Sequence, residues 1–421
     1  MLNTHRSSLL FALVVFLAAC AAPATSTPSP SGLPEVSTAR HPKPADYSGM
    51  NVHADVPKYD PDSDDPWQVD LRSSDLTKLD LSKSKADLFF ANFDSQTKWP
   101  AADKMPADFN WQKIMETGKD PGLGIRTLHD QGVTGKGIGI AIIDQPLLTE
   151  HQEYKDRLQL YEEINILPDT PAQMHGAAVT SIAAGKTVGV APDADLYYIG
   201  AWTGDWKPET DDFTWNFAYY AQAVRRILEI NRSLSEDHKI RVIAMQVGWD
   251  ASQAGYEEIT AAVREAKAAG MLVVSSNLSE TYTWYFQGLG RDPLDDPNQF
   301  ESYRPGLWWE KDFYDGMSLT SHRGKPSQQT LLVPMDSRTT ASPTGVKDYV
   351  FYRSGGWSWS IPYLAGMYAL AAQVKPGITP EEFWKTALKT GRIIQLQRDG
   401  KEYEFGVILD PQALIAAIKP R

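Results

Sequence analysis

The chain has 421 residues, enough for one large catalytic domain with extensions or for two ordinary domains. Its composition, 42% hydrophobic and 22% charged, is typical of a globular protein. The formal net charge of -12 argues against nucleic-acid binding, because proteins of that class carry a basic stripe that neutralises phosphates. The single cysteine excludes an intrachain disulfide.

The N-terminus has the pattern of an export signal. A short charged region precedes an apolar run from Leu9 to Ala19 that is too short to span a bilayer, and the run ends in L-A-A-C at Cys20. This ending resembles the lipobox of bacterial lipoproteins, which implies cleavage before Cys20 and acylation of that residue. We therefore expect residues 1–19 to be a lipoprotein signal peptide. The alternative is an ordinary signal peptide with a coincidental cysteine.

The resemblance also implies a location. The protein would be exported and anchored by lipid on the outer side of the cell membrane, or on the outer membrane of a two-membrane cell. Several acyl chains would make such an anchor stable, since each buried methylene contributes roughly 0.8 kcal/mol.

Two segments separate this anchor from the main domain. Residues 20–60 are rich in Pro, Ser, Thr and Ala, which predicts a disordered tether that begins at acylated Cys20. Residues 61–121 start Asp-rich and then carry irregularly spaced Leu and Phe residues, too apolar for a linker. They predict a small ordered N-terminal extension, and the sequence does not decide whether this extension is removed. The main domain is expected over residues 122–421.

Within the main domain, apolar runs alternate with amphipathic patterns. The runs predict strands, and the patterns between them predict helices. Strands are expected at 137–144, 194–201, 240–247 and 271–277, and helices at 175–185, 213–231 and 256–270 and near 360–373, 379–391 and 410–418. This alternation predicts an α/β fold with a parallel sheet covered by helices on both faces.

Polar residues stand at the ends of these elements, where open parallel sheets gather functional groups. Asp144 ends one expected strand and Asn277 another, while His175 opens a helix of small residues. Ser358 follows two glycines and precedes a helix, whose N-terminus offers unpaired N–H groups and the positive end of a dipole. An Asp or Asn at a strand end alone is usually turn chemistry.

Five segments in order resemble the motifs of the subtilisin-like serine proteases, the subtilase family, and the resemblance covers about 122–421. The segments are I-A-I-I-D ending at Asp144, H-G-A-A-V-T-S-I at 175–182, G-V-A-P-D-A at 189–194, V-V-S-S-N ending at Asn277, and G-W-S-W-S-I-P-Y-L-A-G at 356–366. The order Asp, His, Asn, Ser is that of the family. The resemblance implies a three-layer subtilisin-like α/β fold whose mainly parallel central sheet is flanked by helices.

The resemblance also implies an activity and a site. The chain would be a serine endopeptidase with Asp144, His175 and Ser358 as its catalytic triad, acting on a peptide or protein substrate. The amide of Asn277 and the backbone N–H of Ser358 would form the oxyanion hole. Two residues compete for these roles. Ser360 is set aside because the offset to Pro362 selects Ser358, and His151 is assigned a loop role because no helix follows it.

Several positions depart from the family's pattern. Gln145-Pro146 replace a small pair after the aspartate, and Trp357 and Trp359 flank the serine where the family has Thr and Met. Gln246-Val247-Gly248-Trp249 stand where the family's substrate-binding strand reads S-x-G-G, so we expect Gln246, Gly248 and Trp249 to bind substrate and to re-line its cleft.

Two other functions stay open, the first of them because of these departures. One is a catalytically silent subtilase that acts as a binding or regulatory lipoprotein. The other is a solute-binding lipoprotein of a transporter, which would share the lipobox and tether but would need no ordered triad.

The remaining features concern cofactors and loops. There is no H-E-x-x-H motif and no cysteine cluster, so no metal-based chemistry and no cofactor is expected. The acidic run D-P-L-D-D-P at 292–297 is either a calcium site, of the kind many subtilases use, or a solvated turn. Aromatic residues between Asn277 and Ser358 form either a cleft wall or the packing of a large loop. Nothing in the sequence fixes the oligomeric state.

Overall fold

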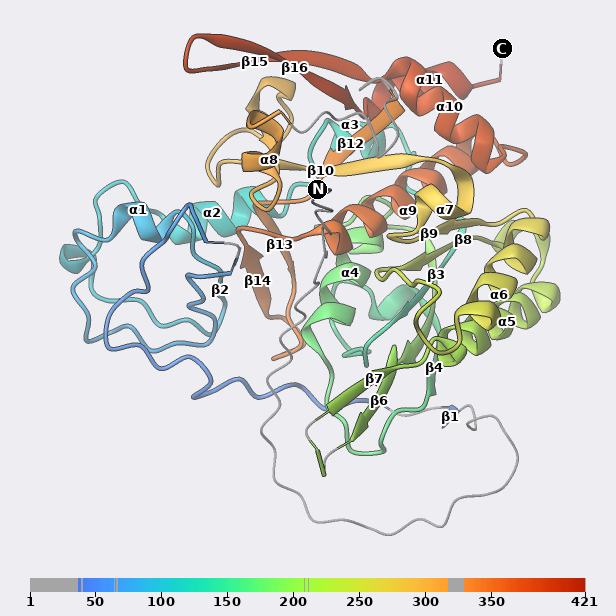
Figure 1. Ribbon diagram of the computed structural model, residues 1–421, viewed down its shortest axis with the longest axis horizontal. Helices are drawn as coiled ribbons and strands as arrows, with labels where there is room; N and C mark the ends of the chain where they lie inside the picture. Colours follow the sequence, from blue (N-terminus) through green and yellow to red (C-terminus); the bar gives the residue numbers. More distant parts are fainter. Residues whose placement is uncertain are drawn as a thin grey trace, which may run out of the picture. The chain divides into compact units, whose positions relative to one another are not determined.

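The computed structural model describes residues 37–38, 41–63, 65, 67–207, 209–210, 212–316 and 329–420 (Figure 1). Its central sheet has the strand order β1-β4-β5-β3-β8-β9, and only β1 runs antiparallel to its neighbour. The strands are β1 (Ser37–Thr38), β4 (Leu158–Ile164), β5 (Asp195–Ala201), β3 (Gly139–Asp144), β8 (Ile240–Met245) and β9 (Leu272–Val274).

Helices cover both faces of this sheet. Helices α5 (Ala218–Ser233) and α6 (Tyr256–Ala268) lie on one face, and α4 (Met174–Ala184) and α9 (Trp357–Val374) lie on the other (Figure 1). Alternate residues of β3 enter the two cores: Ile140 and Ile142 pack with α4 and α9, while Ala141 and Ile143 pack with α5 and α6. The predicted α/β fold with a mainly parallel sheet between helical layers is confirmed.

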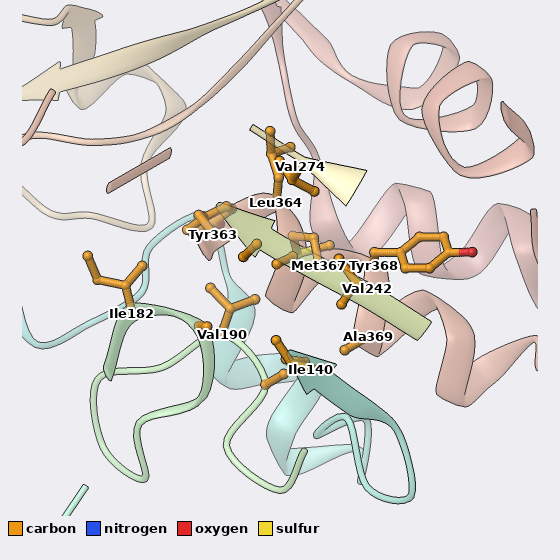
Figure 2. Packing of buried hydrophobic residues seen from close by; sticks show 14 of the residues in the cluster. Ile140, Ile182, Val190, Val242, Val274, Tyr363, Leu364, Met367, Tyr368 and Ala369 are labelled. Atoms are coloured by element: carbon orange, nitrogen blue, oxygen red, sulfur yellow. The ribbon is translucent and has the colours of Figure 1, made fainter. Parts of the chain in front are cut away.

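Small residues let α4 and α9 pack closely against each other. A Cβ at Gly366 of α9 would lie 2.6 Å from the Cβ of Val190 and 2.9 Å from the carbonyl oxygen of Ala183, so no larger residue fits there. Figure 2 shows Ile140, Val242 and Val274 of the sheet in this core with Leu364 and Met367 of α9. This packing fixes the helix that carries Ser358 relative to the helix that carries His175.

A second sheet lies outside this three-layer unit. Its strand order is β11-β10-β12-β16-β15, with β10, β12 and β16 parallel. Its strands are β11 (Tyr303–Pro305), β10 (Tyr285–Arg291), β12 (Thr330–Pro334), β16 (Lys401–Ile408) and β15 (Arg392–Arg398). The sequence interpretation did not include this sheet.

Smaller elements complete the described part of the chain. A three-stranded sheet joins β13 (Arg338–Ala341), β14 (Tyr349–Tyr352) and β2 (Phe93–Asp94), and β6 (Gly204–Lys207) forms a hairpin with β7 (Asp212–Trp215). The remaining α-helices are α1 (Lys85–Leu88), α2 (Trp111–Gly118), α3 (Ile125–Asp130), α7 (Leu278–Tyr282), α8 (Glu310–Tyr314), α10 (Pro380–Thr390) and α11 (Pro411–Ile418).

The predicted tether over residues 20–60 is wrong for residues 41–60. The backbone N–H of Ala45 donates to the carbonyl of Pro343 at 2.9 Å, and Val56 is 3% exposed in a hydrophobic core. The ring of Tyr59 stacks on that of Phe90. These contacts outweigh the Pro- and Ser-rich composition, which alone predicts disorder. Cys20 and the predicted signal peptide lie outside the described residues, and no described helix is long and apolar enough to cross a bilayer.

Candidate active site

Asp144 and His175 form a close pair at the carboxyl end of β3, an interior strand of the central sheet. The Nδ1 atom of His175 lies 2.8 Å from Oδ1 and 2.9 Å from Oδ2 of Asp144. The carboxylate also accepts the backbone N–H of Gln145 at 2.7 Å, and Asp144 is only 3% exposed. A buried carboxylate with these donors holds the imidazole in one orientation and in the tautomer with hydrogen on Nδ1.

Local sequence explains how the two residues meet. Asp144 is the last residue of β3, and His175 lies in the first turn of α4. A Cβ at Gly176 would lie 2.6 Å from the carbonyl oxygen of Gln145, so only glycine after the histidine lets α4 approach the end of β3 this closely. The H-G pair is therefore a packing requirement of the Asp144–His175 contact.

Ser358 lies in the first turn of α9, on the same side of the sheet as His175. Gly356 precedes the helix with a φ of 64°, a conformation that favours glycine. The hydroxyl of Ser358 lies 3.5 Å from the carbonyl oxygen of Gln246. The indole ring of the following residue, Trp359, meets the His175 ring edge-on, with 5.6 Å between the ring centroids.

No hydrogen bond joins the Ser358 hydroxyl to the His175 ring among the residues that the structure describes. Such contacts are often long in the absence of substrate and shorten when substrate binds. The structure thus brings Asp144 and His175 into contact. Ser358 is next in sequence to Trp359, whose ring packs on His175.

Asn277 is held by the segment that follows β8. Its Oδ1 accepts the backbone N–H of Trp249 at 2.8 Å, and its Nδ2 donates to the carbonyl oxygen of the same residue at 2.7 Å. A Cβ at Gly248 would lie 2.7 Å from this Oδ1, so glycine leaves the space for the carboxamide. A carboxamide nitrogen carries two hydrogens, so Nδ2 of Asn277 has a second N–H, whose direction is fixed by these two contacts.

The other two predicted substrate-binding residues face different environments. Gln246 is 8% exposed, and neither polar atom of its carboxamide has a partner among the described residues. Trp249 is 7% exposed, and its ring packs in the core of α5 and α6, 6.1 Å from the ring of Phe217. Trp249 therefore acts near the site through its backbone, and its indole belongs to the core.

Asp336 supports the loop before Ser358, a role that no sequence motif indicated. Its carboxylate accepts the backbone N–H of Gly355 at 3.1 Å and that of Leu307 at 2.8 Å. Asp336 is 2% exposed, and this burial raises its pKa from 3.8 to about 6, although the nearby Arg353 guanidinium opposes the rise. The charged form joins the serine loop to the segment of Leu307.

We expect Asp336→Asn to alter the pH dependence of stability. The pKa of Asp336 is 3.8 in the unfolded chain and about 6 in the folded chain, so at a pH between these values its carboxyl group is protonated in the folded chain and ionised in the unfolded chain. The contribution of this group to the free energy of unfolding therefore falls as the pH rises through that window. Between about pH 4.5 and about pH 7.5, the free energy of unfolding of Asp336→Asn should rise by roughly 2 kcal/mol relative to that of the wild type. Urea denaturation at the two pH values measures this difference. An equal stability difference at both pH values would contradict this prediction.

His151, the competing histidine, is fixed by backbone groups. Its Nε2 lies 2.9 Å from the carbonyl oxygen of Asp348, and its Nδ1 accepts the N–H of Glu153 at 3.2 Å. The residue is fully buried, and burial lowers the pKa of its ring. Both nitrogens are thus engaged in loop structure, as predicted for this residue.

Two aromatic residues of the long stretch after Asn277 contact Trp357, the first residue of α9. The Trp357 indole N–H donates to Oε1 of Gln287 at 2.8 Å. Its ring contacts Phe286 at 5.8 Å and Trp308 at 5.0 Å between centroids. These aromatics therefore pack against the residue beside Ser358.

The acidic run at 292–297 is paired with arginines. Asp292 binds Arg304 at 2.8 Å and Arg353 at 3.3 Å, and Asp295 binds Arg304 at 3.3 Å. Within the described ranges, no group of three or more His, Cys, Asp or Glu side chains is arranged to hold a metal ion.

Part of this chain is similar in sequence to known proteases. A family model described as the subtilase family matches residues 135–305, which include Asp144, His175 and Asn277, while Ser358 lies beyond the match. Subtilisin-like protease PopC of Myxococcus xanthus (strain DK1622) is 32% identical over 85 residues, 18% of this chain and 18% of that protein. Serine protease AprX of Bacillus subtilis (strain 168) is 24% identical over 313 residues, 66% of each chain. The chain therefore matches only part of the length of both relatives.

A solved structure also resembles this chain. Prenylagaramide maturation protease PagA aligns with a TM-score of 0.46 and 15% identity, covering 70% of this chain and 98% of that one.

Proposed function

Because this chain belongs to the subtilase family, we propose that it is a serine endopeptidase in which Asp144, His175 and Ser358 form the catalytic triad. The observation that carries the proposal is the contact of both Asp144 oxygens with Nδ1 of His175, on the side of the sheet where α9 carries Ser358 in its first turn. A solute-binding protein would not need this arrangement.

The proposed reaction is acyl transfer to the serine and then to water. Since Nδ1 of His175 faces the carboxylate, Nε2 is the ring's proton acceptor. It takes the proton of Ser358 as the serine oxygen bonds to the carbonyl carbon of the substrate, and it returns this proton to the amine nitrogen as the C–N bond breaks. Water then attacks the acyl-serine by the same route and releases the acid.

We propose that Asn277 and the N-terminus of α9 stabilise the oxyanion. The first N–H groups of a helix have no carbonyl partner within it, and Ser358 lies in that first turn. The contacts of Asn277 with Trp249 fix one hydrogen of its amide and orient the other. Donors that are already oriented stabilise developing charge without reorganisation.

The test of this function is labelling by a fluorophosphonate probe, which reacts with activated serines. We expect the wild type to be labelled and Ser358→Ala to remain unlabelled, with Ser360→Ala as the matched control in the same helix. A folded wild type that is not labelled would reject the protease and favour a silent subtilase that serves as a binding protein.

We expect Asn277→Ala to lower kcat by about 10²–10³-fold with little change in KM, a magnitude measured for the corresponding donor in a subtilisin. The donor interacts with the oxyanion, so its loss affects the transition state more than the bound substrate. Peptidase kinetics would measure both constants.

Gly248→Ala is the companion variant for Asn277, because its Cβ would displace the Asn277 carboxamide without removing it. Like Asn277→Ala, it should lower kcat. Wild-type kcat in both variants would exclude Asn277 from the oxyanion site.

We also propose that the protein is exported and anchored outside the cytoplasmic membrane through acylated Cys20. The L-A-A-C ending of the N-terminal apolar run supports this location. Metabolic labelling with a palmitate analogue tests it, since labelling should disappear in Cys20→Ser. Equal labelling of both proteins would reject this anchor.

A further inference from the structure

Residues 41–121, which we call the N-terminal segment, share a hydrophobic core with the rest of the chain. Strand β2 pairs antiparallel with β14, and Phe93 lies opposite Phe351. The shared core contains Val69, Leu71, Leu76, Leu81, Leu88, Phe93 and Ile114 of the segment with Val188, Tyr349 and Phe351 of the main domain. Removal of the segment would expose these apolar side chains to water, which is unfavourable in proportion to their area.

The segment also binds polar groups of the loop that leads to Ser358. The backbone N–H of Arg353 donates to Oδ1 of Asn92 at 2.8 Å, and its Nε donates to the carbonyl oxygen of Phe89 at 3.0 Å. Asn92 is fully buried and Arg353 is 3% exposed. Without the segment, a backbone donor and a guanidinium would both lose acceptors inside the protein, which is costly.

A third set of contacts runs from the segment to the ring of His175. Arg72 pairs with Asp70 and donates from Nη1 to the hydroxyl of Tyr352 at 3.4 Å. Tyr352 meets Trp359 edge-on at 5.0 Å between centroids, and Trp359 meets His175 edge-on at 5.6 Å. The segment thus supports the ring that packs on the proposed general base.

We propose that the N-terminal segment is a permanent part of the active enzyme, and that Asn92 and Arg72 are positioning residues for Ser358 and His175. The inference rests on the proposed protease function. A segment that had to be released before activity would leave the site without these contacts. Because the segment contacts the loop before Ser358 and supports the ring that packs on His175, its removal should abolish activity.

The first experiment determines which species is active. The full chain is expressed, labelled with the fluorophosphonate probe, and analysed by intact mass spectrometry. We expect the labelled species to retain residues 41–121. A labelled species that begins near residue 122 would overturn the inference while leaving the protease function intact.

The second experiment tests positioning through Asn92. Asn92→Ala removes the acceptor of the Arg353 N–H and should slow labelling and lower kcat by about 10–100-fold at unchanged KM, as expected when a reacting group is misplaced. Asn92→Asp keeps an oxygen at Oδ1. The replaced Nδ2 has no partner among the described residues, so this variant should restore the wild-type rate.

The control is Lys98→Ala, which removes an exposed ion pair with Asp75 of the same segment and should leave the rate unchanged. If Asn92→Ala does not fold, Arg72→Met provides a second variant with the same expected direction. Wild-type rates in folded Asn92→Ala and Arg72→Met would overturn the positioning role. A wild type that is not labelled would reject the protease function, and the mass of the purified chain would then still show whether the segment is retained.

Discussion

Replacement of Ser358 by alanine should lower kcat by about 10⁶-fold, the loss measured when the nucleophile of a subtilisin is removed. Alanine removes the only oxygen that could attack from this position, and the oxyanion donors that remain support only a small residual rate. Turnover of a dye-quenched unfolded protein measures the effect, with the folded state checked by circular dichroism. A loss smaller than about 10³-fold would mean that another group is the nucleophile.

Ser360→Ala is the matched control for this experiment. Ser360 lies in the same helix but is fully buried, and its hydroxyl has no partner among the described residues. Its replacement removes an unpaired buried oxygen, so kcat should stay at the wild-type value. Loss of turnover in Ser360→Ala, with turnover retained in Ser358→Ala, would show that the sequence motif was aligned two residues too early.

Buried strands and the helices between them could be predicted because each has a simple periodic pattern. The expected strand at 137–144 appears as β3 (Gly139–Asp144), and the expected helix at 256–270 appears as α6 (Tyr256–Ala268). The helix expected from 213 begins only at Ala218, because Asp212–Trp215 form strand β7 of a hairpin. Short hairpin strands lack the apolar run that marks a buried strand.

The second sheet could not be predicted from local patterns. Strand β10 contains Gly288 and Gly290, residues that are depleted in strands. A Cβ at Gly288 would collide with Met335, and one at Gly290 would lie 2.5 Å from the carbonyl oxygen of Pro305. These glycines are required by close packing, which only the folded chain reveals, so the sequence reads as an irregular loop.

The residues of the candidate site could be predicted, but their supports could not. Asp144, His175 and Asn277 stand at element ends that the pattern locates, and local glycines mark the close contacts around them. Asp336 holds the serine loop from a distant strand end, and its sequence neighbourhood carries no motif. Asn92 acts through a backbone hydrogen bond across the chain, which leaves no periodic signal.

The second large effect is expected from Asp144→Asn, which should lower kcat by about 10⁴-fold, the loss measured for the same change in the triad of a serine protease. Both oxygens of Asp144 face Nδ1 of His175, at 2.8 and 2.9 Å. An amide that presents its NH₂ group to this nitrogen favours the tautomer with hydrogen on Nε2. That nitrogen then cannot accept the proton of Ser358.

A second Asp–His pair in the chain provides the control for Asp144→Asn. Asp195 contacts Nδ1 of His238 at 2.7 Å on the surface, and this hydrogen bond raises the pKa of His238. Asp195→Asn makes the same chemical change away from the site, so it should leave kcat unchanged while lowering the pKa of His238, measured by NMR titration. If Asp144→Asn lost less than about tenfold in kcat, Asp144 would not be the group that orients His175. The buried pair would then be a structural contact, and another partner would have to set the imidazole tautomer.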